Sequence, residues 1–146
     1  MYLNYAESLI EVGGEDNLNL AKKYIDKIRT RAGILPLDEA WNDHSNNPGY
    51  QNTQKGLREI VRREREIELH LEGNHFWDSR RWMITEDELS VDNPHKILNV
   101  DGVTDETFFQ IKNSTFIMGF NKAQYLMPIS ASECNKAPQI IQNLFY

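Results

Sequence analysis

The sequence of 146 residues has one cysteine, no long apolar run and no concentrated basic region. A single cysteine, Cys134, excludes an internal disulfide. Apolar runs stay well below the roughly 18 residues of a membrane helix, and no secretory signal is present. We therefore expect the chain as given neither to span a membrane nor to carry its own export signal. The net charge of −6, with arginines matched by glutamates, argues against nucleic acid as a partner.

The clearest helical pattern lies in residues 56–82. Five apolar residues recur at the spacing of one helical face: Leu57, Ile60, Val61, Ile67 and Leu71. Four charged residues lie away from that face: Arg58, Arg62, Arg65 and Glu66. Glu64 and Glu68 interrupt the apolar face, so we expect their carboxylates to point inward, where a charge needs a partner. Loss of either would then cost about 3 to 5 kcal/mol.

The partners are expected from the turn that follows this helix. Gly73 tolerates positive φ and is predicted to end the helix, and Asn74 to cap a short second helix. Arg80 and Arg81 would then reach back to Glu64 and Glu68. Asp78 would face the positive end of the second helix, and three aromatic side chains would fill the corner: Phe76, Trp77 and Trp82.

These residues also carry a family resemblance. The pattern Arg-Arg-Glu-Arg-x-Ile-Glu-Leu-x-x-Glu-Gly-x-x-Phe-Trp-Asp-x-Arg-Arg-Trp at residues 62–82 resembles the signature of the SusD/RagB family, surface glycan-binding lipoproteins of Bacteroidetes-type outer membranes. Segments 5–7, 25–33, 125–129 and 142–146 resemble the family's flanking regions, while His75, Ser79 and Leu144-Phe145 depart from its pattern. The residues that we assign to the structural signature are Arg62, Arg63, Glu64, Glu68, Gly73, Phe76, Trp77, Asp78, Arg80, Arg81 and Trp82.

The resemblance implies a non-enzymatic protein that binds a glycan or another oligomeric nutrient at the cell surface. It also implies a partner, a TonB-dependent outer-membrane transporter of the SusC type, and an N-terminal lipid anchor that Cys134 cannot provide. Residues 1–146 correspond to the C-terminal part of the family pattern, so we expect a fragment of a larger protein. The resemblance implies no cofactor, metal or catalytic residue in this region, and it places the main sugar-contacting aromatics upstream.

The N-terminal part reads as a helical hairpin. Residues 2–12 and 16 to about 32 have helical periodicity, Gly13-Gly14 joins them, and Asp16 or Asn17 would cap the second helix. The hairpin over residues 2–32 resembles a tetratricopeptide repeat, which needs neighbouring repeats for stability. The alternative is that the hairpin packs on the 57–71 helix as a small bundle.

Residues 33–53 are rich in glycine, proline and asparagine and are predicted to form a surface loop. Trp41 and Tyr50 lie in it. An aromatic face beside amide groups is what a sugar site needs, so both are candidate ligand contacts. The alternative is that they anchor the loop to the body.

The C-terminal part is predicted to be loop-rich. Residues 85–106 form an acidic stretch without the spacing of a calcium loop. Three runs are β-prone, 108–111, 115–118 and 125–127, and a turn over 119–122 between the last two predicts a small hairpin that lies on helices. The apolar tail from Pro138 to Tyr146 should dock back on the body. The fold class is thus mainly α, with the helical hairpin, a central helix-turn-helix and at most a small β-hairpin.

Two enzymatic interpretations of the carboxylates compete with a structural role. Glu72 and His75 have the Glu-x-x-His spacing of di-iron bundles, with Glu64 and Glu68 as further ligands, but no second such motif exists. The four histidines, His44, His70, His75 and His95, are scattered and form no metal set. Glu64 and Glu68 also have roughly the 5 Å spacing of a retaining glycosidase pair. A pair that is packed in the interior and neutralised by arginines, however, would have no sugar cleft around it. The alternatives to nutrient binding are a helical-repeat adaptor for protein partners and, less favoured, a carbohydrate-active or metal enzyme.

Overall fold

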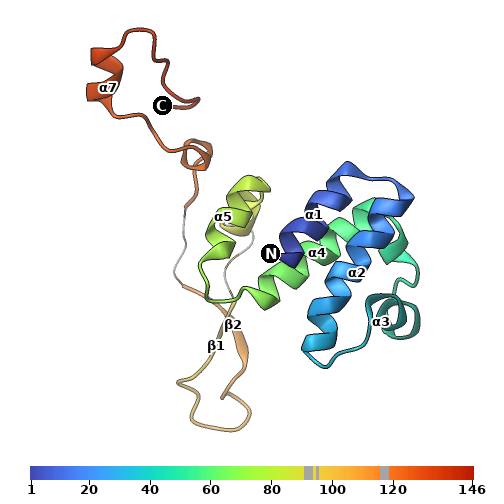
Figure 1. The fold of residues 1–146 in the computed structure, drawn as a ribbon. Coiled ribbons are helices and arrows are strands. Elements are labelled where there is room, and N and C mark those ends of the chain that lie inside the picture. The colour runs from blue at the N-terminus through green and yellow to red at the C-terminus, as the bar shows by residue number, and fades with distance from the viewer. Residues whose placement is uncertain (91–93, 95, 116–118) are drawn as a thin grey trace. The chain divides into compact units, whose positions relative to one another are not determined.

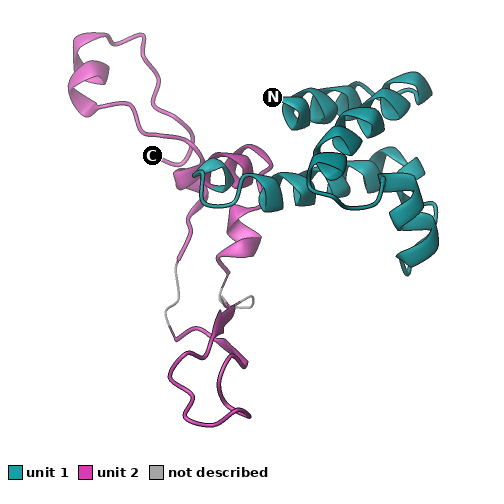
Figure 2. Ribbon diagram, turned by 60° about the horizontal axis from the view of Figure 1, so that its bottom comes forward, with its two compact units in different colours: residues 1–75 teal, residues 76–146 magenta. Residues whose placement is uncertain are grey.

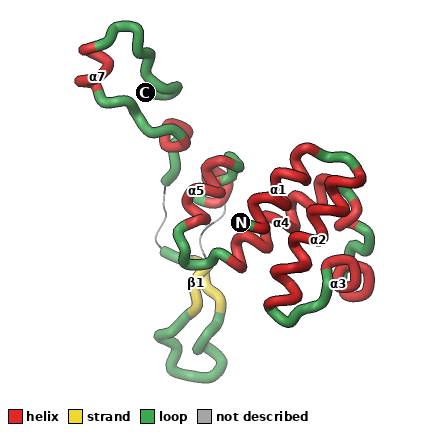
Figure 3. Tube along the Cα trace, in the orientation of Figure 1, coloured by secondary structure: helices red, strands yellow, loops and turns green. Residues whose placement is uncertain are grey.

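The computed structural model describes residues 1–90, 94, 96–115 and 119–146. The chain forms two compact units, residues 1–75 and 76–146 (Figure 2). Helices account for most of the first unit, and the second holds a two-stranded sheet between loops (Figure 3). The fold class predicted from the sequence is confirmed. None of the described helices is long and apolar enough to cross a membrane.

The first unit is a bundle of helices (Figure 1). Its elements are α1 (Tyr2–Val12), α2 (Glu15–Arg31), α3 (Leu37–His44), the 3₁₀ helix η1 (Tyr50–Asn52) and α4 (Gln54–Glu68). Helix α1 packs against both α2 and α4. The hairpin predicted for residues 2–32 is therefore present, and it lies on the signature helix as a small bundle. Its likeness to a tetratricopeptide repeat stays a prediction.

Two glycines make the turn between α1 and α2. Gly13 has φ 75° and Gly14 has φ 90°, a region that side chains with a Cβ rarely adopt. Gly14 occupies the N-cap of α2, so neither Asp16 nor Asn17 caps that helix as predicted. The Asn17 side chain instead donates a hydrogen bond of 2.7 Å to the carbonyl of Gly13, which ties the helix to the turn.

The core of the first unit comes from the apolar faces of these helices. It consists of Leu3, Ala6, Leu9, Ile10, Ala21, Ile25, Leu37, Leu57, Ile60 and Val61. Along α4, the buried apolar residues end at Val61. The prediction that Ile67 and Leu71 share the buried face is wrong, because both are exposed. Leu71 lies beyond the end of α4 at Glu68, in a turn with φ 66°, and Ile67 lies in the last turn of α4.

The segment 33–53 is not a plain loop. Helix α3 begins after Pro36, whose φ of −53° suits a helix start, and Leu37 is fully buried in the core. The Asp26 carboxylate accepts a hydrogen bond of 2.7 Å from the Leu37 amide. The sequence pattern did not indicate α3, because this helix has only 8 residues and buries only Leu37. So short a helix among turn-forming residues shows no clear periodicity.

The second unit is loop-rich. Its elements are α5 (Asn74–Arg81), whose first two residues belong to the first unit, α6 (Thr85–Glu88), β1 (Lys96–Leu98), β2 (Ile111–Asn113), η2 (Lys122–Tyr125) and α7 (Ala131–Lys136). The strands pair antiparallel, with Ile97 opposite Lys112. The hairpin predicted for runs 115–118 and 125–127 falls partly on residues 116–118, which lie outside the described part, and Lys122–Tyr125 form η2. Asn99 decides the pairing, because its main chain accepts from the Phe109 amide and its side chain donates to the Thr107 carbonyl.

The tail is held by amide side chains. Gln142 accepts from the Ile129 amide and donates to its carbonyl, both at 2.8 Å. The Tyr146 hydroxyl donates to the carbonyl of Leu126 at 3.1 Å. The tail thus docks on residues 126–129 of its own unit, through polar contacts, while Ile141 stays exposed.

Candidate functional site

The two carboxylates of the signature helix are paired with arginines of α2. Arg29 donates to Glu64, and Arg31 donates to Glu68. The Arg29 and Glu64 side chains are 12% and 13% exposed, whereas those of Arg31 and Glu68 are 64% and 25% exposed. The prediction that guanidinium groups neutralise both carboxylates is correct. The predicted partners are wrong, because α2 and not the turn after α4 packs beside α4.

Arg65 lies inside the bundle, contrary to its predicted place on the solvent side of α4. It is 5% exposed, lies 3.7 Å from the Glu7 carboxylate and donates to the Asn4 side chain of α1. A long arginine side chain reaches this position because α1 crosses α4 on that side. Charged residues of α4 therefore contact both neighbouring helices.

The charged residues in the second half of the signature contact other residues of the second unit. Asp78 is buried and pairs with Arg81 at 2.8 Å within α5. The Arg80 guanidinium lies 3.5 Å from the centre of the Phe76 ring and 5.6 Å from that of Phe120. Arg80 and Arg81 are thus occupied within their own unit. Phe76 and Trp77 are exposed, so the prediction that they fill a buried corner is wrong, while Trp82 is half-buried.

The remaining signature residues shape the end of α4. The helix ends at Glu68, with the Leu69 amide bonded to the Arg65 carbonyl, so Gly73 does not end it. Gly73 has φ 75° and stands directly before α5. Arg63 is exposed and pairs with Glu66 one turn later at 2.8 Å, and Arg62 is half-buried.

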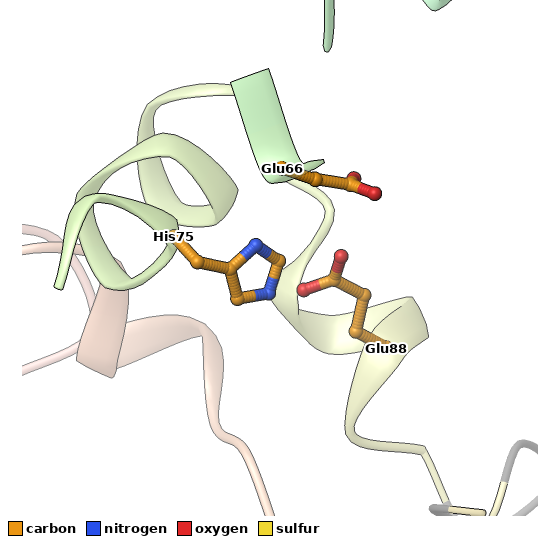
Figure 4. A group of neighbouring side chains, drawn as sticks. All are labelled: Glu66, His75 and Glu88. Atoms are coloured by element: carbon orange, nitrogen blue, oxygen red, sulfur yellow. The ribbon is translucent and has the colours of Figure 1, made fainter. Parts of the chain in front are cut away.

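A di-iron set does not assemble on α4, because Glu64 and Glu68 face α2 through their ion pairs. Figure 4 draws Glu66 and His75 of the first unit with Glu88 of the second. Within the first unit, Glu66 and His75 line one pocket with Arg63, whose guanidinium binds Glu66. Two ligands beside a cation are fewer than the three or four of a protein zinc site, so no metal is proposed here. His95 lies outside the described residues.

Trp41 and Tyr50 lie together on the first unit. Their ring centres are 5.9 Å apart and the planes are inclined by 35°. Trp41 packs against the core from α3, as the anchoring interpretation predicted. The Tyr50 hydroxyl donates to the Glu59 carboxylate at 2.7 Å, and this hydrogen bond raises the pKa of Tyr50 above its usual value. Both rings are half-buried, so part of each remains open to a ligand.

A polar pocket that the sequence analysis missed adjoins the same elements. The Lys22 ammonium is largely buried and donates to Asp38 of α3 at 2.7 Å and to Asn52 of η1 at 2.5 Å. The pocket has a volume of about 410 Å³ and is lined by Gly14, Glu15, Leu18, Asn19, Lys22, Asn52 and Gln54. The available signal was periodicity: Lys22 falls four residues after Leu18 and three before Ile25, on the apolar face of α2.

Comparison with known proteins places the whole chain in one group. Residues 1–146 match the family model described as SusD family. A SusD-like protein (BF3747) from Bacteroides fragilis NCTC 9343 matches with 30% identity and a TM-score of 0.72, over 99% of this chain and 24% of that one. The structure of BT4246 matches with 27% identity and a TM-score of 0.75, over 99% and 22%. No curated protein matches. The chain therefore spans about a quarter of the length of these solved structures.

Proposed function

Because the chain belongs to the SusD family, we propose that it serves in a nutrient-binding protein of the outer membrane. The protein holds a glycan or another oligomeric nutrient at the cell surface, is anchored there by an N-terminal lipid, and passes the nutrient to a TonB-dependent transporter of the SusC type. Residues 1–146 supply the C-terminal part of its fold. The observation that carries this proposal is the match of the complete 146-residue sequence to the family model.

The ion pairs of α4 support a binding role without catalysis. A retaining glycosidase needs one carboxylate free to attack and one free to donate a proton, about 5 Å apart in an open cleft. Glu64 is largely buried against Arg29, and Glu68 binds Arg31. A carboxylate whose oxygen accepts from a guanidinium is held against that partner and is free for neither role. These residues stabilise the contact between α2 and α4.

The Trp41 and Tyr50 rings are the proposed nutrient contacts within residues 1–75. A sugar ring presents C–H groups that pack on an aromatic face, and each ring has an exposed part. The bond from Tyr50 to Glu59 and the packing of Trp41 on the core hold both rings in place. Binding would thus require little reordering of either side chain.

Calorimetric titration of the 146-residue chain with oligosaccharides tests the contact. Trp41→Ala should weaken binding about fivefold to tenfold, the worth of one aromatic contact. Trp77→Ala is the matched control, since Trp77 is an exposed tryptophan of the second unit and should leave the affinity unchanged. Equal effects of both substitutions would exclude the Trp41–Tyr50 contact.

The wider proposal is tested in the source organism. Deletion of the gene should abolish growth on the bound oligosaccharide, and the tagged protein should co-purify from outer membranes with a TonB-dependent transporter. Mass spectrometry of the sugar after incubation should show no cleavage product. Cleavage by the purified protein, with loss of cleavage in Glu64→Gln, would overturn the non-enzymatic role.

A further inference from the structure

The pocket lined by Gly14, Glu15, Leu18, Asn19, Lys22, Asn52 and Gln54 belongs wholly to the first unit. Four elements surround it: the turn after α1, the first half of α2, the end of η1 and the first residue of α4. Its volume of about 410 Å³ falls in the range of small-molecule sites. The ion pairs of the signature helix take no part in it.

Three of its side chains, Lys22, Asn52 and Gln54, are held by hydrogen bonds and still have hydrogen-bonding capacity. An ammonium has three N–H donors, and within the described residues Lys22 uses two of them, on Asp38 and Asn52. Asn52 accepts through its carbonyl oxygen, so its NH₂ group has no partner in the part of the chain that the structure describes. Gln54 donates to the Ile10 carbonyl at 2.6 Å, which positions its own amide oxygen as an acceptor.

The balance of charge selects the kind of ligand. Lys22 is paired with Asp38, and Glu15 adds a carboxylate to the lining, so the pocket offers no net positive charge to a phosphate or another anion. It offers amide donors and acceptors from Asn19, Asn52 and Gln54 beside an apolar surface at Leu18. Neutral hydroxyl groups, which both donate and accept, next to C–H groups complement this lining.

We infer that this pocket binds one ring of a neutral saccharide, with Lys22 and the Asn19 and Asn52 amides contacting its hydroxyl groups. The choice of a saccharide rests on the proposed function. The elements that build the pocket also carry the aromatic contact, since η1 contributes both Tyr50 and Asn52. Helix α3 likewise contributes Trp41 to the ring pair and Asp38 to the Lys22 pair.

The test is a nuclear magnetic resonance titration of the 146-residue chain, which reports each side-chain amide separately. The probes are glucose, galactose, mannose and xylose, with inorganic phosphate as the anionic comparison. The side-chain NH₂ signals of Asn19 and Asn52 should shift saturably with at least one sugar and not with phosphate. Shifts with phosphate alone, or no shift with any sugar, would overturn the inference.

Substitutions sharpen the result. Asn19→Ala should weaken binding by about fivefold without altering the melting temperature, because Asn19 is exposed and makes no side-chain hydrogen bond within the described structure. Lys22→Met should weaken it by about tenfold or more, whereas Lys23→Met, which removes an exposed charge from the neighbouring position, should not. Unchanged affinity in Asn19→Ala would exclude the pocket even if Lys22→Met fails to fold.

The test also separates this inference from the proposed function. Sugar-induced shifts confined to the Trp41 indole and Tyr50 ring would refute the pocket and leave nutrient binding intact. Saturable shifts at Asn19 and Asn52, with unimpaired growth of the deletion strain on every oligosaccharide, would leave the pocket and refute the uptake role.

Discussion

Replacement of Glu64 by glutamine is the sharpest test of how the signature helix works. The substitution keeps the size and one carbonyl oxygen of the side chain but removes its charge. Arg29 then keeps its full positive charge in a site where its side chain is only 12% exposed. The Glu64 side chain is 13% exposed, so water replaces little of the lost interaction.

The magnitude follows from the contacts that remain. Removal of one partner of a fully buried pair costs about 3 to 5 kcal/mol. Arg29 retains a hydrogen bond of 2.7 Å to the Leu35 carbonyl, and the new amide oxygen can still accept from it. The loss is therefore closer to that of one charge-assisted hydrogen bond, about 2 to 3 kcal/mol.

Glu68→Gln is the matched control, four residues along the same helix. Its partner Arg31 is 64% exposed, so this pair should contribute only about 0 to 1 kcal/mol. By scanning calorimetry we expect Glu64→Gln to lower the melting temperature by about 5 to 10 °C and Glu68→Gln by less than about 3 °C. High salt should diminish the smaller effect and leave most of the larger one.

The reasoning would be refuted by equal destabilisation in the two variants, since their exposure is the only difference invoked. It would also fail if Glu64→Gln melted like the unmodified chain while a hydrolytic activity disappeared. That outcome would assign Glu64 to chemistry and not to the contact between helices.

Two further predictions concern the contacts of α4. Gly56→Ala should destabilise the first unit, because the alanine Cβ would lie 2.0 Å from the Tyr50 carbonyl oxygen. This clash outweighs the preference of about 1 kcal/mol for alanine in a helix interior. Urea denaturation measures the change in the free energy of unfolding, and an increase would contradict the prediction. The hydrogen bonds from Arg58 lower the pKa of Glu11 from its ordinary 4.5. Since the folded pKa is the lower one, the pair stabilises above pH 4.5 and this contribution is lost as the pH falls through the folded value. Glu11→Gln should therefore be less stable than the unmodified chain at pH 7 and equally stable in acid, as denaturation at several pH values would show.

Several features of the fold follow from neighbouring residues alone. The three-to-four spacing of apolar residues identified α1, α2 and the first half of α4, and Gly13-Gly14 identified the turn. The signature at residues 62–82 identified the family. Each of these signals is short-range, because helical periodicity and turn geometry depend on a few consecutive residues.

The charged residues show what such short-range patterns cannot determine. The sequence indicated that Glu64 and Glu68 need cationic partners, but the choice between α2 and the turn after α4 depends on which helix packs alongside. The same holds for Arg65, whose burial results from the crossing of α1. Strand pairing was equally undetermined, since Asn99 closes the loop between β1 and β2 through contacts with residues 107–110.

In the candidate site, too, local sequence identified some residues and packing determined the others. Sequence composition was enough to select Trp41 and Tyr50, because aromatic residues among asparagines are visible without coordinates. Composition could not identify the pocket at Lys22, because its lining comes from two separate segments, residues 14–22 and 52–54, which meet only when α1, α2 and α4 share one core. Local pattern thus determines which helices form and what chemistry they carry. Only packing decides which charged and polar groups meet, because a side chain finds its partner through space and not along the chain.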